Sequence, residues 1–221
     1  MTKLIIAIVL ALSSTFSNAQ LRGSGKTITK TYDYKNFDKV SFEDLDGKIE
    51  IEIGSEFSVS VIIDDNLFSL LDFKEDSSKN ELTLFFNNNN NNRKYIEDTH
   101  LKIKITMPRI VQVNHSGNSS LIISKLSADT FKLENSGNAT ATISGSVTTL
   151  EVFNKGNGNT RAKELIAQNA AIKCSGNGNV YVTVLEKLTA TASGNCSVIN
   201  YGKANFDSES KKSGNGDLII K

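Results

Sequence analysis

The 221-residue sequence predicts an all-β protein. The expected fold is a right-handed parallel β-helix, a solenoid of about 20-residue coils, with an irregular N-terminal β cap. Three observations predict it. A Gly-Asn pair recurs six times, apolar and polar residues alternate around each pair, and the chain contains a single proline. Few prolines and many Asn, Ser, Thr and Gly residues favour long hydrogen-bonded strands broken by tight turns.

Residues 1–19 have the pattern of a secretory signal peptide. Lys3 is followed by a nine-residue apolar run at 4–12 and by a small-residue cleavage site at 17–19. The run is shorter than the roughly 20 residues that span a bilayer, and no later segment approaches that length. We therefore expect an exported chain, located in the periplasm, at the cell surface or outside the cell, with no transmembrane segment once the signal is removed.

The next residues, 20–31, are expected to form a linker, followed by an N-terminal β region or cap over 32–110. Alternation at 48–53 and 57–61, with turn signals at Asp46-Gly47 and Gly54-Ser55, predicts a β-hairpin there. A third alternating stretch covers 101–105. Because a β-helix leaves open edges at its ends, this region is expected to cap or to begin the solenoid.

Three shorter features complete the N-terminal region. Residues 66–71 fit a single helical turn, and Lys79-Asn80 separates two short strands. The asparagine run at 87–92 fits an exposed loop.

Residues 111–221 carry the repeat. The glycines of successive Gly-Asn pairs lie 20, 19, 20, 18 and 20 residues apart. Positions four before and four and six after each glycine are mainly apolar, which is the period-two pattern of strands with one buried face. Units of this length bury that face by coiling, each coil stacking on the last at about 4.8 Å.

The Gly-Asn pairs are interpreted as structural corners, because glycine tolerates any φ and asparagine tolerates a left-handed conformation. Stacked asparagine amides can also hydrogen-bond from coil to coil. The six pairs are Gly117-Asn118, Gly137-Asn138, Gly156-Asn157, Gly176-Asn177, Gly194-Asn195 and Gly214-Asn215.

The two cysteines face inward in consecutive coils, Cys174 two positions before its glycine and Cys196 two positions after. Counted along a strand they lie four columns apart, beyond the roughly 7 Å Cα separation that a disulfide allows. The register therefore predicts two buried free thiols.

Composition and motifs give little support to catalysis. The net charge of +1 excludes a general basic field for nucleic acid. Glu134 and Glu151 are the best acid pair, outward in adjacent coils and spaced as in inverting glycosidases, but Lys132 beside them favours a solvated charge cluster. His115 is expected to stack with Asn135 and Asn154. No metal, cofactor or catalytic residues are assigned.

One outward column is unexpectedly apolar. Five positions after each glycine it contains Ile122, Tyr181, Ile199 and Ile219, interrupted by Thr142 and Arg161. This column is a candidate binding stripe. The alternative is that β-branched and aromatic residues simply favour strands.

The frame of residues 37–41 and 48–51, then 103–113, then tandem Ser-Gly-Asn-Gly units resembles the head GIN family. That family comprises exported bacterial proteins regarded as heads of autotransporter adhesins. The resemblance covers residues 37–221 and implies a β-helical fold with a surface or adhesion role, and no catalytic residues come with it.

These observations predict an exported, non-enzymatic binding or adhesion module of the cell envelope. Its partner is expected to be a surface molecule, a glycan or another copy. The last coil at 218–221 presents an open edge, which favours pairing with another chain. The alternatives are a carbohydrate-active β-helix enzyme, either hydrolase or lyase, and a purely structural envelope component.

Overall fold

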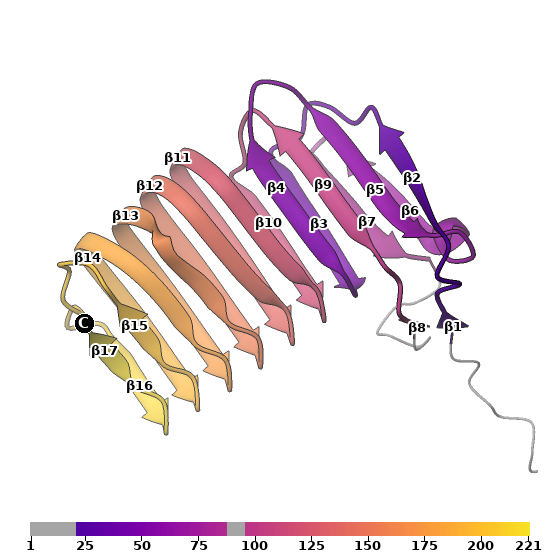
Figure 1. Ribbon diagram of the computed structural model, residues 1–221. Helices are drawn as coiled ribbons and strands as arrows, with labels where there is room; N and C mark the ends of the chain where they lie inside the picture. Colours follow the sequence, from indigo (N-terminus) through magenta and orange to yellow (C-terminus); the bar gives the residue numbers. More distant parts are fainter. Residues whose placement is uncertain (1–20, 88–95) are drawn as a thin grey trace, which may run out of the picture.

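The computed structural model describes residues 21–87 and 96–221, most of which lie in strands (Figure 1). The predicted signal peptide and all but the first residue of the asparagine run lie outside the described residues. Within those two ranges, no helix has both the length and the apolar character needed to cross a membrane.

The repeat units form the coils of a parallel β-solenoid, as predicted (Figure 1). Strands β11 to β14 each run around most of one coil and pair in parallel with the next. Repeat glycines lie over one another, since Gly137 pairs with Gly156 and Gly156 with Gly176. The repeat strands are β10 (Gln112–Gly117), β11 (Ser120–Gly137), β12 (Thr140–Gly156), β13 (Thr160–Gly176), β14 (Val180–Gly194), β15 (Val198–Asn200), β16 (Lys211–Gly214) and β17 (Leu218–Ile220).

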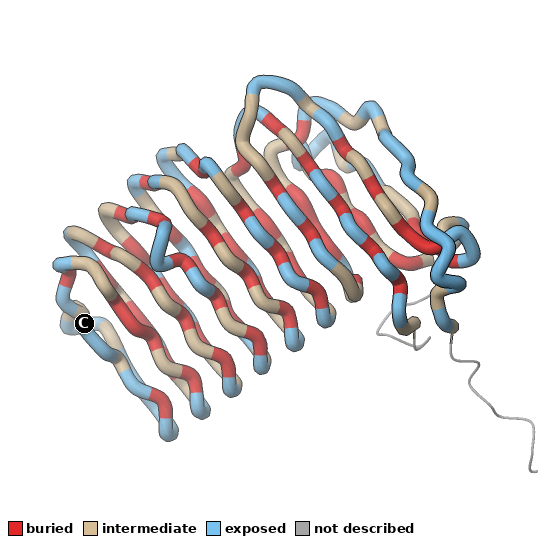
Figure 2. Tube along the Cα trace, viewed as in Figure 1, coloured by how far each residue is buried: buried red, intermediate tan, exposed pale blue. Residues whose placement is uncertain are grey.

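Inward columns stack from coil to coil and form the core. In the column four before the glycine, Val113, Leu133, Val152 and Ile172 pair in sequence and are almost fully buried. Buried residues alternate with more exposed ones along much of the long strands β11 to β14 in Figure 2, which is the period-two pattern of the sequence. Each such Val, Leu or Ile contributes about 1.5–3 kcal/mol by leaving water.

The N-terminal region continues the solenoid on two faces. On one, β10 pairs with β3 (Lys39–Leu45), β3 with β7 (Glu81–Phe86), and β7 with β6 (Leu71–Asp76). On the other, β11 pairs with β4 (Lys48–Ile53) and β4 with β9 (Lys102–Met107), followed by β5 (Ser58–Asp64) and β2 (Thr27–Tyr32). The outermost pairs, β6·β7, β9·β5 and β5·β2, are antiparallel.

This topology corrects one sequence prediction. Strands β4 and β5 do not form a hairpin, because β9 lies between them and pairs with both. A local turn signal could not reveal that a strand from about 50 residues further on fills the gap. The expected helical turn is present as a short 3-10 helix, η1 (Phe68–Leu70), and Lys79-Asn80 does separate the antiparallel pair β6 and β7. A two-residue pair, β1 (Leu21–Arg22) with β8 (Ile96–Glu97), lies beside the cap.

Each repeat glycine turns a corner with a positive φ. At Gly137 φ is 75°, a conformation that side chains other than glycine's rarely adopt. A Cβ added there would lie 2.8 Å from the Gly117 carbonyl oxygen of the adjacent coil. Both the corner conformation and the close stacking therefore require glycine.

The asparagines that follow these glycines form a hydrogen-bonded ladder on the surface. At each step Nδ2 of one asparagine donates to Oδ1 of the asparagine in the preceding coil, at 2.7–3.1 Å. The ladder runs through Asn118, Asn138, Asn157, Asn177, Asn195 and Asn215. These amides bond coil to coil, as in the Asn ladders of stacked strands.

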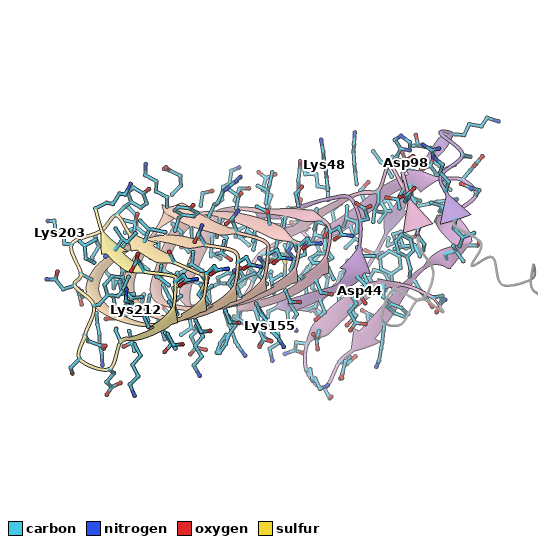
Figure 3. All side chains as sticks on the ribbon, turned by 90° about the horizontal axis from the view of Figure 1, so that it is seen from below. Asp44, Lys48, Asp98, Lys155, Lys203 and Lys212 are labelled. Atoms are coloured by element: carbon cyan, nitrogen blue, oxygen red, sulfur yellow. A yellow bond between two sulfur atoms is a disulfide. The ribbon has the colours of Figure 1, made fainter. Side chains whose placement is uncertain are left out.

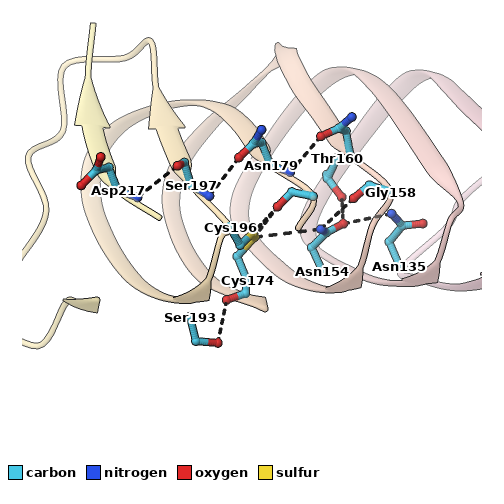
Figure 4. Close-up of a disulfide and its surroundings, with 12 residues drawn as sticks. Asn135, Asn154, Gly158, Thr160, Cys174, Asn179, Ser193, Cys196, Ser197 and Asp217 are labelled. Atoms are coloured by element: carbon cyan, nitrogen blue, oxygen red, sulfur yellow. Dashed lines mark hydrogen bonds between the residues drawn. A yellow bond between two sulfur atoms is a disulfide. The ribbon is translucent and has the colours of Figure 1, made fainter. Parts of the chain in front are cut away.

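The prediction of two free thiols is wrong. Cys174 and Cys196 form a disulfide, with their Cα atoms 5.9 Å apart (Figure 4). The strand count failed because the chain turns at the glycine, which brings the columns two before and two after it face to face. Asn154 shows the same proximity within one coil, since its Nδ2 donates to the Gly158 carbonyl at 2.9 Å. The disulfide crosses this corner between consecutive coils.

Candidate functional site: a groove on the outer face of the solenoid

A groove of about 590 Å³ crosses the coils on the outer face that contains β3, β10 and the final segments of β11 to β14. Its side chains come mostly from the outward columns one and three positions before the repeat glycine. Lys155, whose side chain projects outward in Figure 3, belongs to the first of these columns. The second column forms one row in register through Ser41, Asn114, Glu134, Phe153, Lys173 and Thr191.

Phe153 is the aromatic residue of the outward row. Its ring is half-buried and lies between two lysines, with Lys132 Nζ 5.0 Å and Lys173 Nζ 5.5 Å from the ring centroid. Such cation–π contacts hold flexible lysine side chains close to the ring. Lys132 also forms an ion pair with Glu134, at 2.6 Å. The centre of the groove is thus an aromatic ring with ammonium groups beside it.

The N-terminal end of the groove is polar and hydrogen-bonded. Asn114 Nδ2 donates to Ser41 Oγ at 2.9 Å, and Gln112 Nε2 donates to Asn114 Oδ1 at 3.0 Å. The Ser41 hydroxyl in turn donates to the Glu81 carboxylate. These bonds fix the orientation of the Asn114 amide, which then presents defined donors and acceptors to the groove.

Beneath the groove lies a buried polar column, two positions before the glycine. His115 Nδ1 is 2.9 Å from Asn135 Oδ1, and its Nε2 is 2.7 Å from Ser119 Oγ. Asn135 Nδ2 donates to Asn154 Oδ1 at 3.0 Å. Because the Asn135 oxygen is an acceptor, His115 carries its proton on Nδ1 and accepts at Nε2 from the serine. Burial lowers the pKa of His115 to about 4, so the ring is neutral and structural.

The two glutamates considered as an acid pair are not equivalent in the structure. Glu134 lines the groove and is ion-paired with Lys132. Glu151 stands opposite Lys132 in the strand register, is exposed, and does not line the groove. The groove does not bring the two carboxylates together around a shared space. The described residues also contain no group of three His, Cys, Asp or Glu side chains placed to hold a metal ion.

The candidate apolar stripe is one register-aligned row on another outer face, that of β4 and β15. It runs through Ile122, Thr142, Arg161, Tyr181, Ile199 and Ile219. Ile122 and Ile219 are 45% and 36% exposed, Tyr181 is half-buried, and Ile199 is only 6% exposed. The apolar members of the stripe are therefore exposed mainly at its two ends, and its role in binding stays a prediction.

Sequence reasoning missed the groove, although its signal was present. The column three before the glycine holds Asn114, Glu134, Phe153, Lys173, Thr191 and Lys211, a mixture of an aromatic ring, amide, hydroxyl and charges. Because no residue type recurs from one coil to the next in this column, its pattern alone does not indicate a binding surface. Only the stacking of coils shows that Phe153, Lys132 and Lys173 touch.

Fold and groove together define a class of protein, a parallel β-solenoid with a polar outer groove around one aromatic ring. The chain belongs to the family described as "Putative auto-transporter adhesin, head GIN domain", which matches residues 36–204. The resemblance found in the sequence is thereby confirmed. Comparison with curated proteins finds no match to the chain.

Solved structures share the fold. A putative adhesin from Bacteroides fragilis superposes with a TM-score of 0.72 at 21% identity, covering 91% of this chain and 100% of its own. A putative adhesin from Parabacteroides distasonis gives 0.54 at 16% identity, covering 91% and 100%. A putative lipid binding protein from the same species gives 0.53 at 23% identity, covering 91% and 99%. At these identities the likeness shows the fold alone.

Proposed function

We propose that this protein is an exported, non-enzymatic adhesion module of the bacterial cell envelope, and that the groove around Phe153 binds its partner, a surface glycan. Membership of an adhesin family supports the adhesion role. The groove is the observation that carries the assignment of the binding face, because it combines a concave surface, an aromatic ring and oriented polar groups.

The backbone beneath the groove favours a ligand read by side chains. The parallel ladders from β10 to β14 pair the backbone of one coil with that of the next, so the face offers a partner side chains and not a free strand edge. Proteins that take up extended peptides commonly add them to such an edge. A hydroxyl-rich ligand suits the serine, threonine, asparagine and lysine side chains that line this groove.

Two features support export. The N-terminal 19 residues have the signal pattern described above. Cys174 and Cys196 form a buried disulfide, and structural disulfides persist mainly in oxidising compartments. Cell fractionation with a protease-accessibility assay tests this part of the proposal. Finding the protein only in the cytoplasm would contradict it.

The non-enzymatic part rests on how the ionisable groups are held. The carboxylate of Glu134 is ion-paired with Lys132, and His115 is buried and hydrogen-bonded through both ring nitrogens. Release of reducing ends from polysaccharides, lost in Glu134→Gln or Glu151→Gln, would instead establish the carbohydrate-active enzyme.

Binding is tested by applying the purified protein and two matched variants to a glycan array. Phe153→Ala should lower the affinity for the captured glycans about tenfold, since an aromatic group at the centre of a site commonly contributes over 1 kcal/mol of binding free energy. Tyr181→Ala removes a half-buried aromatic residue from the apolar stripe and should leave binding unchanged. Loss of binding in the second variant alone would move the site to the stripe, and no capture of any glycan would contradict the proposal.

A further inference from the structure

We propose that the C-terminal half of the groove is an anion subsite, and that the ligand is an acidic glycan whose sugar carboxylates contact Lys155 and Lys173. This inference rests on the proposed function of the groove as a glycan site. It adds the chemical class of the glycan and the residues that select it.

The charges of the groove are divided along its length. Glu43 and Glu134 lie toward the N-terminal end, and the latter is paired with Lys132. Lys155 and Lys173 lie toward the other end, and within the described part of the chain neither forms an ion pair. Two uncompensated ammonium groups on adjacent coils therefore face the same part of the groove.

The row extends this positive end. Lys173 pairs with Thr191, and Thr191 with Lys211, so a further lysine stands in the same column two coils beyond Lys173. At about 4.8 Å for each coil, the two columns place ammonium groups at intervals of roughly 5–10 Å along the solenoid axis. A polymer lying across the coils, with charges repeated along its length, would meet several of them.

Phe153 places Lys173 in this subsite. The lysine ammonium lies 5.5 Å from the ring centroid, which restricts a side chain that would otherwise sample many rotamers. Hydroxyls of Ser175, Thr191 and Ser193 line the groove beside it. An ammonium held among hydroxyl donors favours a carboxylate, because charge-assisted hydrogen bonds are stronger than neutral ones.

The other half of the groove selects a sugar over a simple polyanion. Its neutral amide and hydroxyl groups, those of Asn114 and Ser136, are suited to sugar hydroxyls. The Glu43 carboxylate disfavours an anionic group at that end, so the sugar carboxylates are expected at the lysine end of the groove. Net charge of +1 and this short basic segment also disfavour nucleic acid.

The test compares acidic glycans with a neutral partner of the same backbone. Binding of the purified protein to polygalacturonate, alginate, hyaluronan and polysialic acid is measured by titration calorimetry, alongside methyl-esterified polygalacturonate. We expect at least one acidic glycan to bind, and esterification to abolish binding of polygalacturonate if that is the ligand. Raising the salt concentration should weaken the interaction, because screening acts on exposed charges.

Variants locate the effect. Lys155→Gln and Lys173→Gln should each raise the Kd about fivefold, the effect of one partly exposed ion pair. Lys203→Gln is the matched control, because Lys203 lies in the chain between β15 and β16, at the end of the molecule remote from the cap (Figure 3), and should have no effect.

The outcomes separate the two proposals. If neutral glycans bind, Phe153→Ala weakens them, and the lysine variants do not, the anion subsite is overturned while the groove stands as the glycan site. If none of the four acidic glycans binds, the anion subsite is likewise overturned. If neither acidic nor neutral glycans bind, the proposed function fails as well. Binding of DNA without binding of the four carboxylated glycans would show a general polyanion surface and would also overturn the inference.

Discussion

Replacing Asn154 with alanine should destabilise the solenoid strongly, whereas replacing Asn157, three residues along the same coil, should not. Asn154 is 1% exposed and belongs to the buried polar column, while Asn157 belongs to the exposed ladder. Both asparagines make side-chain hydrogen bonds between coils, Asn154 with Asn135, and Asn157 with Asn138 and Asn177. The comparison therefore separates burial from hydrogen bonding in the same residue type.

The expected magnitude follows from the bonds that each residue makes. Asn154 Nδ2 donates to the Gly158 carbonyl at 2.9 Å, and its Oδ1 accepts from Asn135 Nδ2 at 3.0 Å and Thr160 Oγ1 at 2.9 Å. Alanine leaves these buried partners short of a bond, at roughly 1 kcal/mol or more each, so we expect a loss of about 3–4 kcal/mol. Water can replace the bonds of Asn157, and its loss should cost about 0.5 kcal/mol.

The assay is urea unfolding of both variants followed by far-ultraviolet circular dichroism, with the midpoint and slope compared with those of the unsubstituted protein. A lower midpoint for Asn154→Ala at an unchanged slope would report stability alone. Equal losses in the two variants would refute the reasoning, because the buried column would then contribute no more than the surface ladder. A large loss for Asn157→Ala alone would reverse the assignment of the two ladders.

Three further predictions concern stability. Replacing Cys174 and Cys196 with serine should lower the unfolding free energy by about 3 kcal/mol, from the entropy of a closed loop with a sequence separation of 22, and alkylated non-reduced protein should weigh two hydrogens less than reduced protein. The pKa of His115 is about 4 in the folded protein and 6.5 in the unfolded chain, so the unfolded chain binds more protons between these two pH values. The free energy of unfolding should therefore decrease as pH falls through that window, by up to about 3 kcal/mol. His115→Asn, which introduces the side chain found at this column in the next coils, should abolish this pH-dependent loss in unfolding curves measured in parallel. Gly137→Ala should cost about 2–4 kcal/mol and Gly25→Ala about 1 kcal/mol in thermal unfolding, because φ is similar (75° and 80°) but only the first added Cβ meets another coil; equal costs would leave φ as the sole cause.

The sequence by itself determined the solenoid. The recurrence of Gly-Asn at nearly constant spacing, with alternating apolar columns, indicated the coil length, the inward faces and the corners. The alternation is local and recurs in every coil. A coil that departs from the pattern therefore does not change the register predicted for the others. The stacking of His115 with Asn135 was likewise predicted from one shared column.

Only the tertiary structure decided what lies between columns and between distant strands. The disulfide of Cys174 with Cys196, the insertion of β9 between β4 and β5, and the contact of Phe153 with Lys132 and Lys173 all depend on it. In each case the relevant distance runs through space across a corner or between coils, where counting residues along a strand gives no measure of separation. The groove belongs to this second group, because its lining residues share a face of the solenoid but no sequence motif.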